Sequence, residues 1–237
     1  MRHDLLIEGL ANVRDLGGLK RSDGSVTPRG VFVRAEALDR LTPAGWDRLS
    51  AHGVRTVLDL RRPHERTGAV PAGIARVCLD LDGDDEAFWS PLEADGRWGT
   101  PLYYLAHLRE LPDRLAAVLD AIASAPEGAV LFHCGAGWDR TGLLAAVLLR
   151  ALDVTEDDAA SDYLASFANA AAMTAVHNRS FDAEERLEVL ARFGHTADSA
   201  FRAAYRDLDL DEWFDLADVA PKTRLAVTTW RGSTDRA

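Results

Sequence analysis

The sequence HCGAGWDRTG occupies residues 133–142 and separates two apolar segments of different kinds. The segment before it, Ala129-Val130-Leu131-Phe132, is short and apolar throughout, as expected of a buried parallel strand. The segment after it is apolar on every side from Leu143 to Leu149, which predicts a central helix over about residues 141–151. A glycine-rich turn from a strand into a helix presents backbone N–H groups at the positive end of the helix dipole. The stretch therefore predicts an anion-binding loop.

Strands and helices alternate on both sides of this loop. The patterns predict strands at Val31–Arg34, Val54–Leu60 and Ile74–Leu81, and helices at residues 44–52, at residues 102–110 and from Pro112 onward. From residue 155 to about 218 the pattern is helical, and a further strand is possible at Leu225–Trp230. The sequence therefore predicts a single α/β domain over residues 1–237. It has three layers, with a mostly parallel central sheet flanked by helices and a helix-rich C-terminal part at 155–218.

The segment at residues 83–112 interrupts this alternation. Its first part, residues 83–101, is acidic and contains Phe88, Trp89 and Trp98. It is longer than a routine connection between elements. Such segments often form lids or contact substrate, but a surface insertion without a function is an equally good interpretation.

Composition argues against several classes of function. A net charge of −11 disfavours a nucleic-acid-binding surface. Because no apolar run approaches the roughly 20 residues that span a bilayer, the sequence predicts no membrane insertion. Residues 1–4 do not resemble a signal peptide, which indicates a cytoplasmic protein. Two cysteines are too few for a disulfide framework or a cysteine-type zinc site, and the histidines show no metal-ligand spacing, so we expect no cofactor and no metal. The sequence does not predict the oligomeric state.

The loop has the residue types that a phosphate site needs. Backbone N–H groups of successive loop residues can surround a tetrahedral anion, and glycines at 135 and 137 permit the backbone angles that this requires. The Arg140 guanidinium can hold two phosphate oxygens at once, which a lysine could not do. The predicted phosphate-binding residues are Gly135, Ala136, Gly137, Trp138, Asp139 and Arg140.

Cys134 lies inside this positive field. A cysteine at a helix N-terminus and beside a cation is favoured in its thiolate form, which makes it a nucleophile directed at phosphorus. The Thr141 hydroxyl could donate a hydrogen bond to the sulfur, and the ring nitrogens of His133 could fix the loop.

The pattern His-Cys, five residues, Arg-Thr-Gly resembles the signature of the cysteine-based phosphatases, the protein tyrosine phosphatase superfamily. NVRDLGG at residues 12–18, FVRAEAL at 32–38 and VLDLR at 57–61 resemble the bacterial tyrosine phosphatase family, which also includes phosphoinositide-active and secreted members. Asp162-Tyr163-Leu164 lies where that family commonly has the same triplet. The resemblance covers about residues 7–170, and the C-terminal part lacks the family's usual Tyr-Gly-Ser segment.

The resemblance implies a phosphomonoester hydrolase that acts without a metal. Cys134 attacks phosphorus to form a phosphocysteine, Arg140 stabilises the transferring group, an acid protonates the leaving oxygen, and water then releases phosphate. Asp139 matches the aspartate that related loops use as the acid. A salt bridge that orients Arg140 is an equally good interpretation of Asp139, and the rival acids are Asp82, Asp84 and Asp85.

The resemblance implies phosphotyrosine on proteins as the leading substrate, with a small molecule or a phosphoinositide as the alternative. Lipid-active members usually have Ala-Gly-Lys-Asp-Arg-Thr here, and Trp138 takes the place of that lysine. The local Gly-Trp-Asp-Arg-Thr resembles the loop of the myotubularin lipid phosphatases. Trp138 could line the pocket mouth and stack on a substrate ring, or pack at the rim against the lid. A pseudophosphatase that binds phosphorylated partners is disfavoured because Cys134, Arg140 and a candidate acid are all present.

The remaining candidates are mainly structural. We expect Cys78 to be buried on a strand, and a weaker alternative is a protective disulfide with oxidised Cys134. Asp59 and Arg61 form an ordinary ion pair or brace the phosphate loop. Three further residues are expected to tie the N-terminal arm to the body of the domain: Asn12, Arg14 and Asp15.

Overall fold

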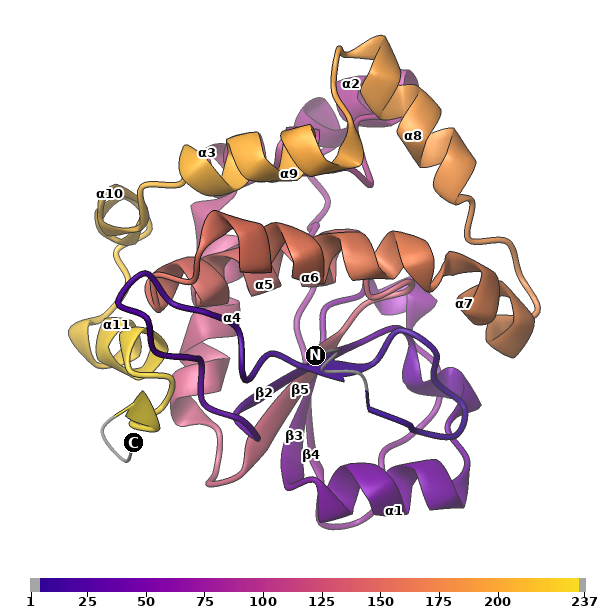
Figure 1. The fold of residues 1–237 in the computed structure, drawn as a ribbon, viewed down its shortest axis with the longest axis vertical. Coiled ribbons are helices and arrows are strands. Elements are labelled where there is room, and N and C mark those ends of the chain that lie inside the picture. Colours follow the sequence, from indigo (N-terminus) through magenta and orange to yellow (C-terminus); the bar gives the residue numbers. More distant parts are fainter. Residues whose placement is uncertain (1–4, 235–237) are drawn as a thin grey trace.

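A five-stranded sheet forms the centre of the computed structural model, which describes residues 5–234 (Figure 1). The strand order is β1-β2-β5-β3-β4. The strands are β1 (Arg14–Asp15), β2 (Phe32–Ala35), β3 (Val54–Asp59), β4 (Ala75–Cys78) and β5 (Ala129–His133). β1 pairs antiparallel with β2, and the other three pairings are parallel. The predicted, mostly parallel sheet is therefore confirmed.

Successive side chains of β5 point to opposite faces of the sheet, as the period of a strand requires. Leu131 packs in an apolar cluster with Leu49 of α1 (Pro43–Ala51). Phe132 packs on the other face, in the cluster formed with α4 (Pro112–Ser124) and α5 (Asp139–Ala151). Figure 1 shows α1 on one side of the sheet and the other helices on the opposite side. The three predicted layers are confirmed.

The C-terminal part is helical, as predicted. Its helices are α6 (Glu156–Ala168), α7 (Ala170–His177), α8 (Ala183–Arg192), α9 (Ala197–Arg206), α10 (Leu210–Leu216) and α11 (Pro221–Thr228). The strand predicted at Leu225–Trp230 is wrong, because α11 covers most of this range. Pro221 occupies the first turn of α11, where a missing N–H costs nothing. Thr223, Val227 and Trp230 are buried at helical spacing rather than in alternation.

The segment at residues 83–112 is largely helical, and the helix predicted at residues 102–110 is confirmed by α3 (Tyr104–Glu110). The segment also contains α2 (Glu86–Asp95) and a 3-10 helix η3 (Pro101–Tyr103). The Asp85 side chain caps α2, and Gly96 ends it with φ 84°. α2 lies beside α8, where Arg192 Nη2 donates to the Asp95 carbonyl at 3.0 Å (Figure 1). Two segments far apart in the sequence therefore meet.

Residues 1–4, which underlie the expected absence of a signal peptide, lie outside the described residues. Across residues 5–234, none of the helices combines the length and the apolarity that crossing a membrane requires.

Candidate active site

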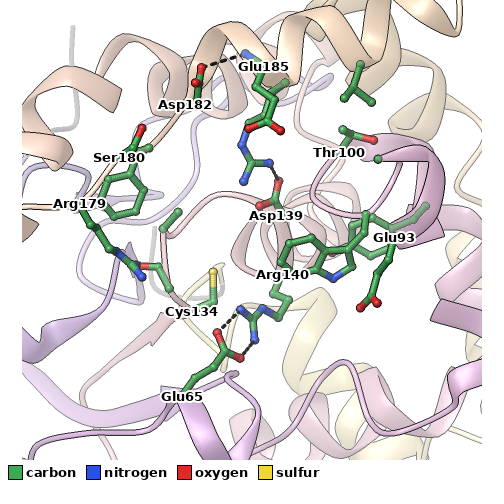
Figure 2. Close-up of a pocket in the computed structure, with 18 residues that line it drawn as sticks. Glu65, Glu93, Thr100, Cys134, Asp139, Arg140, Arg179, Ser180, Asp182 and Glu185 are labelled. Atoms are coloured by element: carbon green, nitrogen blue, oxygen red, sulfur yellow. Dashed lines mark hydrogen bonds and ion pairs between the residues drawn. The ribbon is translucent and has the colours of Figure 1, made fainter. Parts of the chain in front are cut away.

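The predicted loop connects the carboxyl end of β5 to α5. Cys134 follows β5 directly and is almost completely buried, at 2% exposure. It lies in the lining of a cavity of about 620 Å³, together with Gly135, Asp139 and Arg140. Figure 2 shows its sulfur pointing into this cavity. β5 lies between β2 and β3, and ligands of parallel sheets bind at such carboxyl ends.

The carbonyl groups of the loop are bound from outside it. Gly135 O accepts from Ala37 N at 3.0 Å, and Ala136 O accepts from Asn12 Nδ2 at 3.0 Å. Gly137 O accepts from Arg34 Nη2 at 2.9 Å, and Arg34 is itself paired with Asp162. These contacts fix the orientation of the peptide groups.

The backbone N–H groups of the same loop are free. Within the part of the chain that the structure describes, no acceptor takes a hydrogen bond from the N–H of residues 135–138. Backbone donors away from water are normally paired, so a row of unpaired ones beside a buried thiol indicates a place for an anion. The loop therefore has the arrangement that a phosphate cradle requires.

Only one of the two loop glycines is required by the backbone. Gly137 has φ +65°, and a side chain there would overlap the backbone of Ala35 and lie 2.5 Å from Glu36 N. Gly135 does not have a positive φ, and a Cβ there would meet nothing closer than 3.5 Å. The prediction that both glycines supply special backbone angles is therefore wrong for Gly135.

We expect Gly137→Ala to destabilise the fold by at least about 1–3 kcal/mol, because it combines a strained φ with a backbone overlap. At this chain length each kcal/mol lowers the melting temperature by about 2–4 °C. Thermal denaturation of Gly137→Ala and of the matched control Gly135→Ala checks this. Equal melting temperatures for the two variants would contradict it.

His133 holds the loop as predicted. Its Nδ1 donates to the Cys134 carbonyl at 3.2 Å, and its Nε2 lies 3.8 Å from Asp59 Oδ2. Burial lowers the pKa of His133 to about 4, although Asp59 acts in the opposite direction. Asp59 also pairs with Arg61 and Arg76, so it is both a structural ion-pair partner and a support for the loop.

The Thr141 hydroxyl does not make its predicted contact. Its Oγ1 is buried and has no hydrogen-bond partner among the described residues, so it is not bonded to the Cys134 sulfur. Thr141 lies in the first turn of α5 and is completely buried.

Arg140 is held by a carboxylate that the sequence did not reveal. Glu65, in the 3-10 helix η2 (Pro63–Glu65), accepts from Arg140 Nη1 at 2.5 Å and from Nη2 at 2.8 Å (Figure 2). Burial lowers the pKa of Arg140, but this pair and the charges of Cys134 and Asp82 raise it overall. Burial raises the pKa of Glu65, whereas Arg140 lowers it, to about 2. A guanidinium has more N–H groups than Glu65 occupies, so donors remain for a phosphate.

Asp139 lines the cavity beside Cys134, but its partner is not Arg140. Its Oδ1 accepts from Arg186 Nη1 of α8 at 2.6 Å (Figure 2). The interpretation of Asp139 as the residue that orients Arg140 is therefore wrong, because Glu65 takes that place. Burial raises the pKa of Asp139, and the charges of Arg186 and Arg140 partly oppose the increase.

The three rival acids lie outside the cavity lining. Asp84 and Asp85 are exposed, and Asp85 is used to cap α2. Asp82 is buried and its pKa is raised by burial, but its Oδ2 lies 3.0 Å from Arg62 Nε. The geometry therefore favours Asp139 over all three.

Trp138 is buried behind the loop. Its ring packs edge-to-face on Phe167 with centroids 4.3 Å apart, and the Arg186 guanidinium lies 4.5 Å from the ring centroid. The side chain has no exposed surface. Both predicted positions, the pocket mouth and the rim, are wrong, because α6 and α8 cover this side of the loop.

Two walls enclose the cavity. The first comes from the C-terminal end of α2 and the segment that follows it, and includes Glu93, Trp98, Thr100 and Tyr103. This placement favours substrate contact over a surface insertion without a function.

The second wall is the connection from α7 into α8, which sequence reasoning did not assign to the site. Arg179 Nη2 donates to the Gly135 carbonyl at 3.2 Å, and its guanidinium lies 4.6 Å from the Phe181 ring centroid. Asp182 and Glu185 belong to the same wall. Asp182 caps α8, and a cap residue in the sequence marks where a helix begins but not where that helix lies in space.

Cys78 is exposed on the edge strand β4, so the prediction that it is buried is wrong. β3 lies between β4 and β5. Two strand spacings of about 4.8 Å place Cys78 roughly 10 Å across the sheet from the end of β5. A disulfide requires Cα atoms within about 7 Å, so a bond to Cys134 would need the backbone to move.

Asn12, Arg14 and Asp15 tie the N-terminal arm to the body as predicted. Asn12 holds the phosphate loop, Arg14 pairs with Asp162 of α6, and Asp15 lies 2.7 Å from the ring nitrogen Nε2 of His52, which follows α1. No three His, Cys, Asp or Glu side chains in residues 5–234 form a group that could hold a metal ion.

The model of the tyrosine phosphatase family matches residues 5–214, well beyond the 7–170 range of the motif resemblance. A putative tyrosine-protein phosphatase of Cupriavidus necator is 31% identical over 173 residues, covering 70% of this chain and 63% of its own. A tyrosine-protein phosphatase of Nostoc commune is 32% identical over 145 residues, covering 59% and 49%. The triple specificity protein phosphatase PtpB of Mycobacterium tuberculosis is 32% identical over 170 residues, covering 58% and 61%. The chain thus spans between about half and two thirds of the length of these curated relatives.

Proposed function

Because the chain belongs to the tyrosine phosphatase family, we propose that it hydrolyses phosphomonoesters through a phosphocysteine, with phosphotyrosine in proteins as the substrate. The observation that carries this proposal is the juxtaposition of a buried thiol, a row of unpaired backbone N–H groups and a buried guanidinium in one cavity. We treat residues 1–237 as one catalytic domain, in which 83–112 and 155–218 supply the two walls.

In the first step the Cys134 thiolate attacks phosphorus. The new S–P bond forms as the ester P–O bond breaks, and Asp139 gives its proton to the leaving oxygen. The loop N–H groups and Arg140 bind the phosphoryl oxygens, whose charge is spread in the transition state. In the second step the Asp139 carboxylate takes a proton from water, which attacks the phosphocysteine and releases inorganic phosphate and the Cys134 thiolate.

The cavity favours a phosphorylated aromatic ring. Tyr103, Trp98 and Phe181 line its walls above the loop, and rings pack well against other rings. The walls also contain Glu93, Asp182 and Glu185, which would repel a polyphosphorylated head group. Because the reaction requires a reduced thiol, a reducing compartment such as the cytoplasm suits this function.

A phosphoinositide or another substrate with a second anionic group is the alternative, and one observation favours it. Arg179 lies in the cavity lining, and no carboxylate of the described residues is within ion-pair distance of it. Its charge is therefore available beside Gly135, although the loop has Trp138 in place of a lysine.

A substrate panel in the presence of EDTA tests the proposal. Phosphotyrosine peptides, inositol phosphates, nucleotides and sugar phosphates are compared by phosphate release. We expect the highest kcat/KM for phosphotyrosine peptides. Preference for inositol phosphates would support the alternative, and binding of phosphopeptides without release would indicate a pseudophosphatase and contradict the proposal.

We expect Asp139→Asn to lower kcat on phenyl phosphate by about 10²–10⁴-fold, the usual contribution of a general acid. The loss should be much smaller on dinitrophenyl phosphate, whose leaving group needs no proton. Since the acid acts in its protonated form, the rate falls as pH rises through its pKa. Burial raises the pKa of Asp139, so the falling limb of the plot of kcat against pH lies above the ordinary carboxyl range. In the asparagine variant this falling limb is lost.

The control for this variant is Asp84→Asn, which changes an exposed carboxylate outside the cavity. It should match the wild type in rate and in pH profile. An unchanged rate for Asp139→Asn would move the acid role to the buried Asp82.

A further inference from the structure

Arg186 contacts three separate parts of the site. It lies in α8, and its Nη1 donates to Asp139 Oδ1 at 2.6 Å. The same nitrogen donates to the Gly99 carbonyl in the first wall. The guanidinium plane also lies over the Trp138 ring, 4.5 Å from its centroid. One side chain thus joins the phosphate loop, the candidate acid and both walls of the cavity.

We propose that Arg186 is a positioning residue that holds the Asp139 carboxyl in its catalytic orientation when the two walls meet over the cavity. This inference rests on the proposed function, because it assumes that Asp139 is the general acid. It adds a residue that acts through Asp139 and makes catalysis depend on the placement of α8 against the phosphate loop and the first wall.

The guanidinium group suits this position better than any other cation. It is planar and can stack on an indole while its edge donates to two acceptors. An ammonium would give a point charge with no fixed plane. A lysine in place of Trp138 would bring a second positive charge against Arg186, so the tryptophan in the loop and the arginine in α8 fit each other. Trp138 is therefore explained by its neighbour rather than by the substrate.

The first wall and the phosphate loop both hold the Arg186 guanidinium. Arg186 belongs to α8, and Gly99 belongs to the connection between α2 and η3. Gly99 has φ +83°, and a Cβ there would lie 3.0 Å from Arg186 Nη1, so the backbone approaches the guanidinium closely. If α8 moved away, Asp139 would lose its partner, and if the first wall moved away, Arg186 would lose the carbonyl that helps to hold its guanidinium in place. Restraint of a reacting group is a large part of catalysis, since a misplacement of about 1 Å can cost about 10²-fold in rate.

Asp139 faces few other charges. The titratable groups around its carboxyl are Arg140 of α5, Cys134 of the loop, Tyr103 of η3, Tyr104 of α3, Tyr163 of α6 and Arg186 of α8. Of the two arginines, Arg186 is bonded to the carboxylate, whereas Arg140 is bonded to Glu65. Arg186 favours the charged form and so lowers the pKa of Asp139, against the larger effect of burial.

The test compares Arg186→Gln, Arg186→Lys and the control Arg192→Gln in the full chain. Arg192 lies on the same helix and also bonds to the first wall, at the Asp95 carbonyl, but it does not line the cavity. For each variant, kcat and KM are measured against pH with phenyl phosphate and with dinitrophenyl phosphate, and folding is checked by thermal denaturation.

For Arg186→Gln we expect kcat on phenyl phosphate to fall by about tenfold to 10²-fold, with a much smaller loss on dinitrophenyl phosphate. Because the glutamine removes a charge that lowers the pKa of Asp139, the falling limb should move to higher pH, by about one pH unit. Arg186→Lys should keep the limb near its wild-type position but lose part of kcat on phenyl phosphate. Arg192→Gln should match the wild type in kcat on phenyl phosphate and in the position of the falling limb.

Three results would overturn the inference. The first is a falling limb of the pH profile that does not move in Arg186→Gln. The second is an equal loss of kcat on phenyl phosphate and on dinitrophenyl phosphate in that variant. The third is the same change of kcat and pH profile in the control Arg192→Gln. If Arg186→Gln does not fold, Arg186→Lys is the test of the proposal. A wild-type kcat of Arg186→Lys on phenyl phosphate would contradict it. The proposed function fails separately, if the wild type releases no phosphate or if Cys134→Ser retains the wild-type rate.

Discussion

We expect Cys134→Ser to lower kcat on an aryl phosphate by at least about 10⁴-fold, the scale of losing a catalytic nucleophile. A serine hydroxyl ionises far less readily than a thiol, so the attacking atom becomes a poor nucleophile at neutral pH. The cradle itself should survive, because it consists of backbone groups and of Arg140, which is held by Glu65. Steady-state phosphate release measures the loss.

The control is Cys78→Ser, which changes an exposed thiol on the edge strand and should keep the wild-type rate. Calorimetric titration with inorganic phosphate should show that Cys134→Ser still binds the anion. A serine variant that retained a substantial rate, or a cysteine control that lost it, would show that the reaction does not pass through Cys134.

We expect Arg140→Lys to lower kcat/KM by about 10³–10⁵-fold, the range found for arginines that stabilise phosphoryl transfer. A lysine keeps the charge but lacks the planar fork that bonds to Glu65 through two nitrogens and still presents N–H groups to the phosphate. The Glu65 carboxylate, released from its two bonds to Arg140, would then repel the incoming phosphate. The rate of phosphate release at low substrate concentration gives kcat/KM directly.

The matched control is Arg62→Lys. Arg62 pairs with the same Asp82 that lies 3.4 Å from Arg140, but it does not line the cavity. We expect the kcat/KM of Arg62→Lys to remain within a few-fold of the wild-type value. If the kcat/KM of Arg140→Lys also remained within a few-fold of the wild type, the guanidinium would not be the group that binds the phosphoryl oxygens.

The sequence predicted those parts of the site that are continuous in the chain. The loop at residues 133–142, the strand before it and the helix after it follow from local patterns of glycines and apolar residues. Cys134, Asp139 and Arg140 lie close to one another because the loop is short. Local patterns were sufficient for these residues because the loop that contains them is continuous in the chain, whereas the groups that fix its carbonyls come from distant segments.

The residues that sequence reasoning missed all reach the cavity through tertiary contacts. Glu65 is 75 residues from Arg140, and Arg186 is 47 residues from Asp139. Their positions depend on how η2 and α8 pack, which no local pattern reports. The placement of Trp138 was wrong for the same reason, because its burial is decided by Phe167 and Arg186.

The wrong assignments elsewhere have similar causes. The short β-branched run before Trp230 is typical of a strand. Pro221 nevertheless begins a helix that packs beside α4, where the Thr223 hydroxyl donates to Asp120. Cys78 was expected to be buried because its strand is apolar, yet β4 lies at the edge of the sheet. Strand order is a tertiary property, so the exposure of an edge strand cannot be read from its composition.

The most direct test of the central claim is a search for the covalent intermediate. Wild-type protein is mixed with an aryl phosphate, quenched within the first turnover and analysed by intact mass and peptide mapping. We expect one added phosphoryl group on the peptide that contains Cys134, with none on Cys134→Ala. A phosphoryl group on any other residue, or hydrolysis without any phosphorylated protein in the first turnover, would contradict the account.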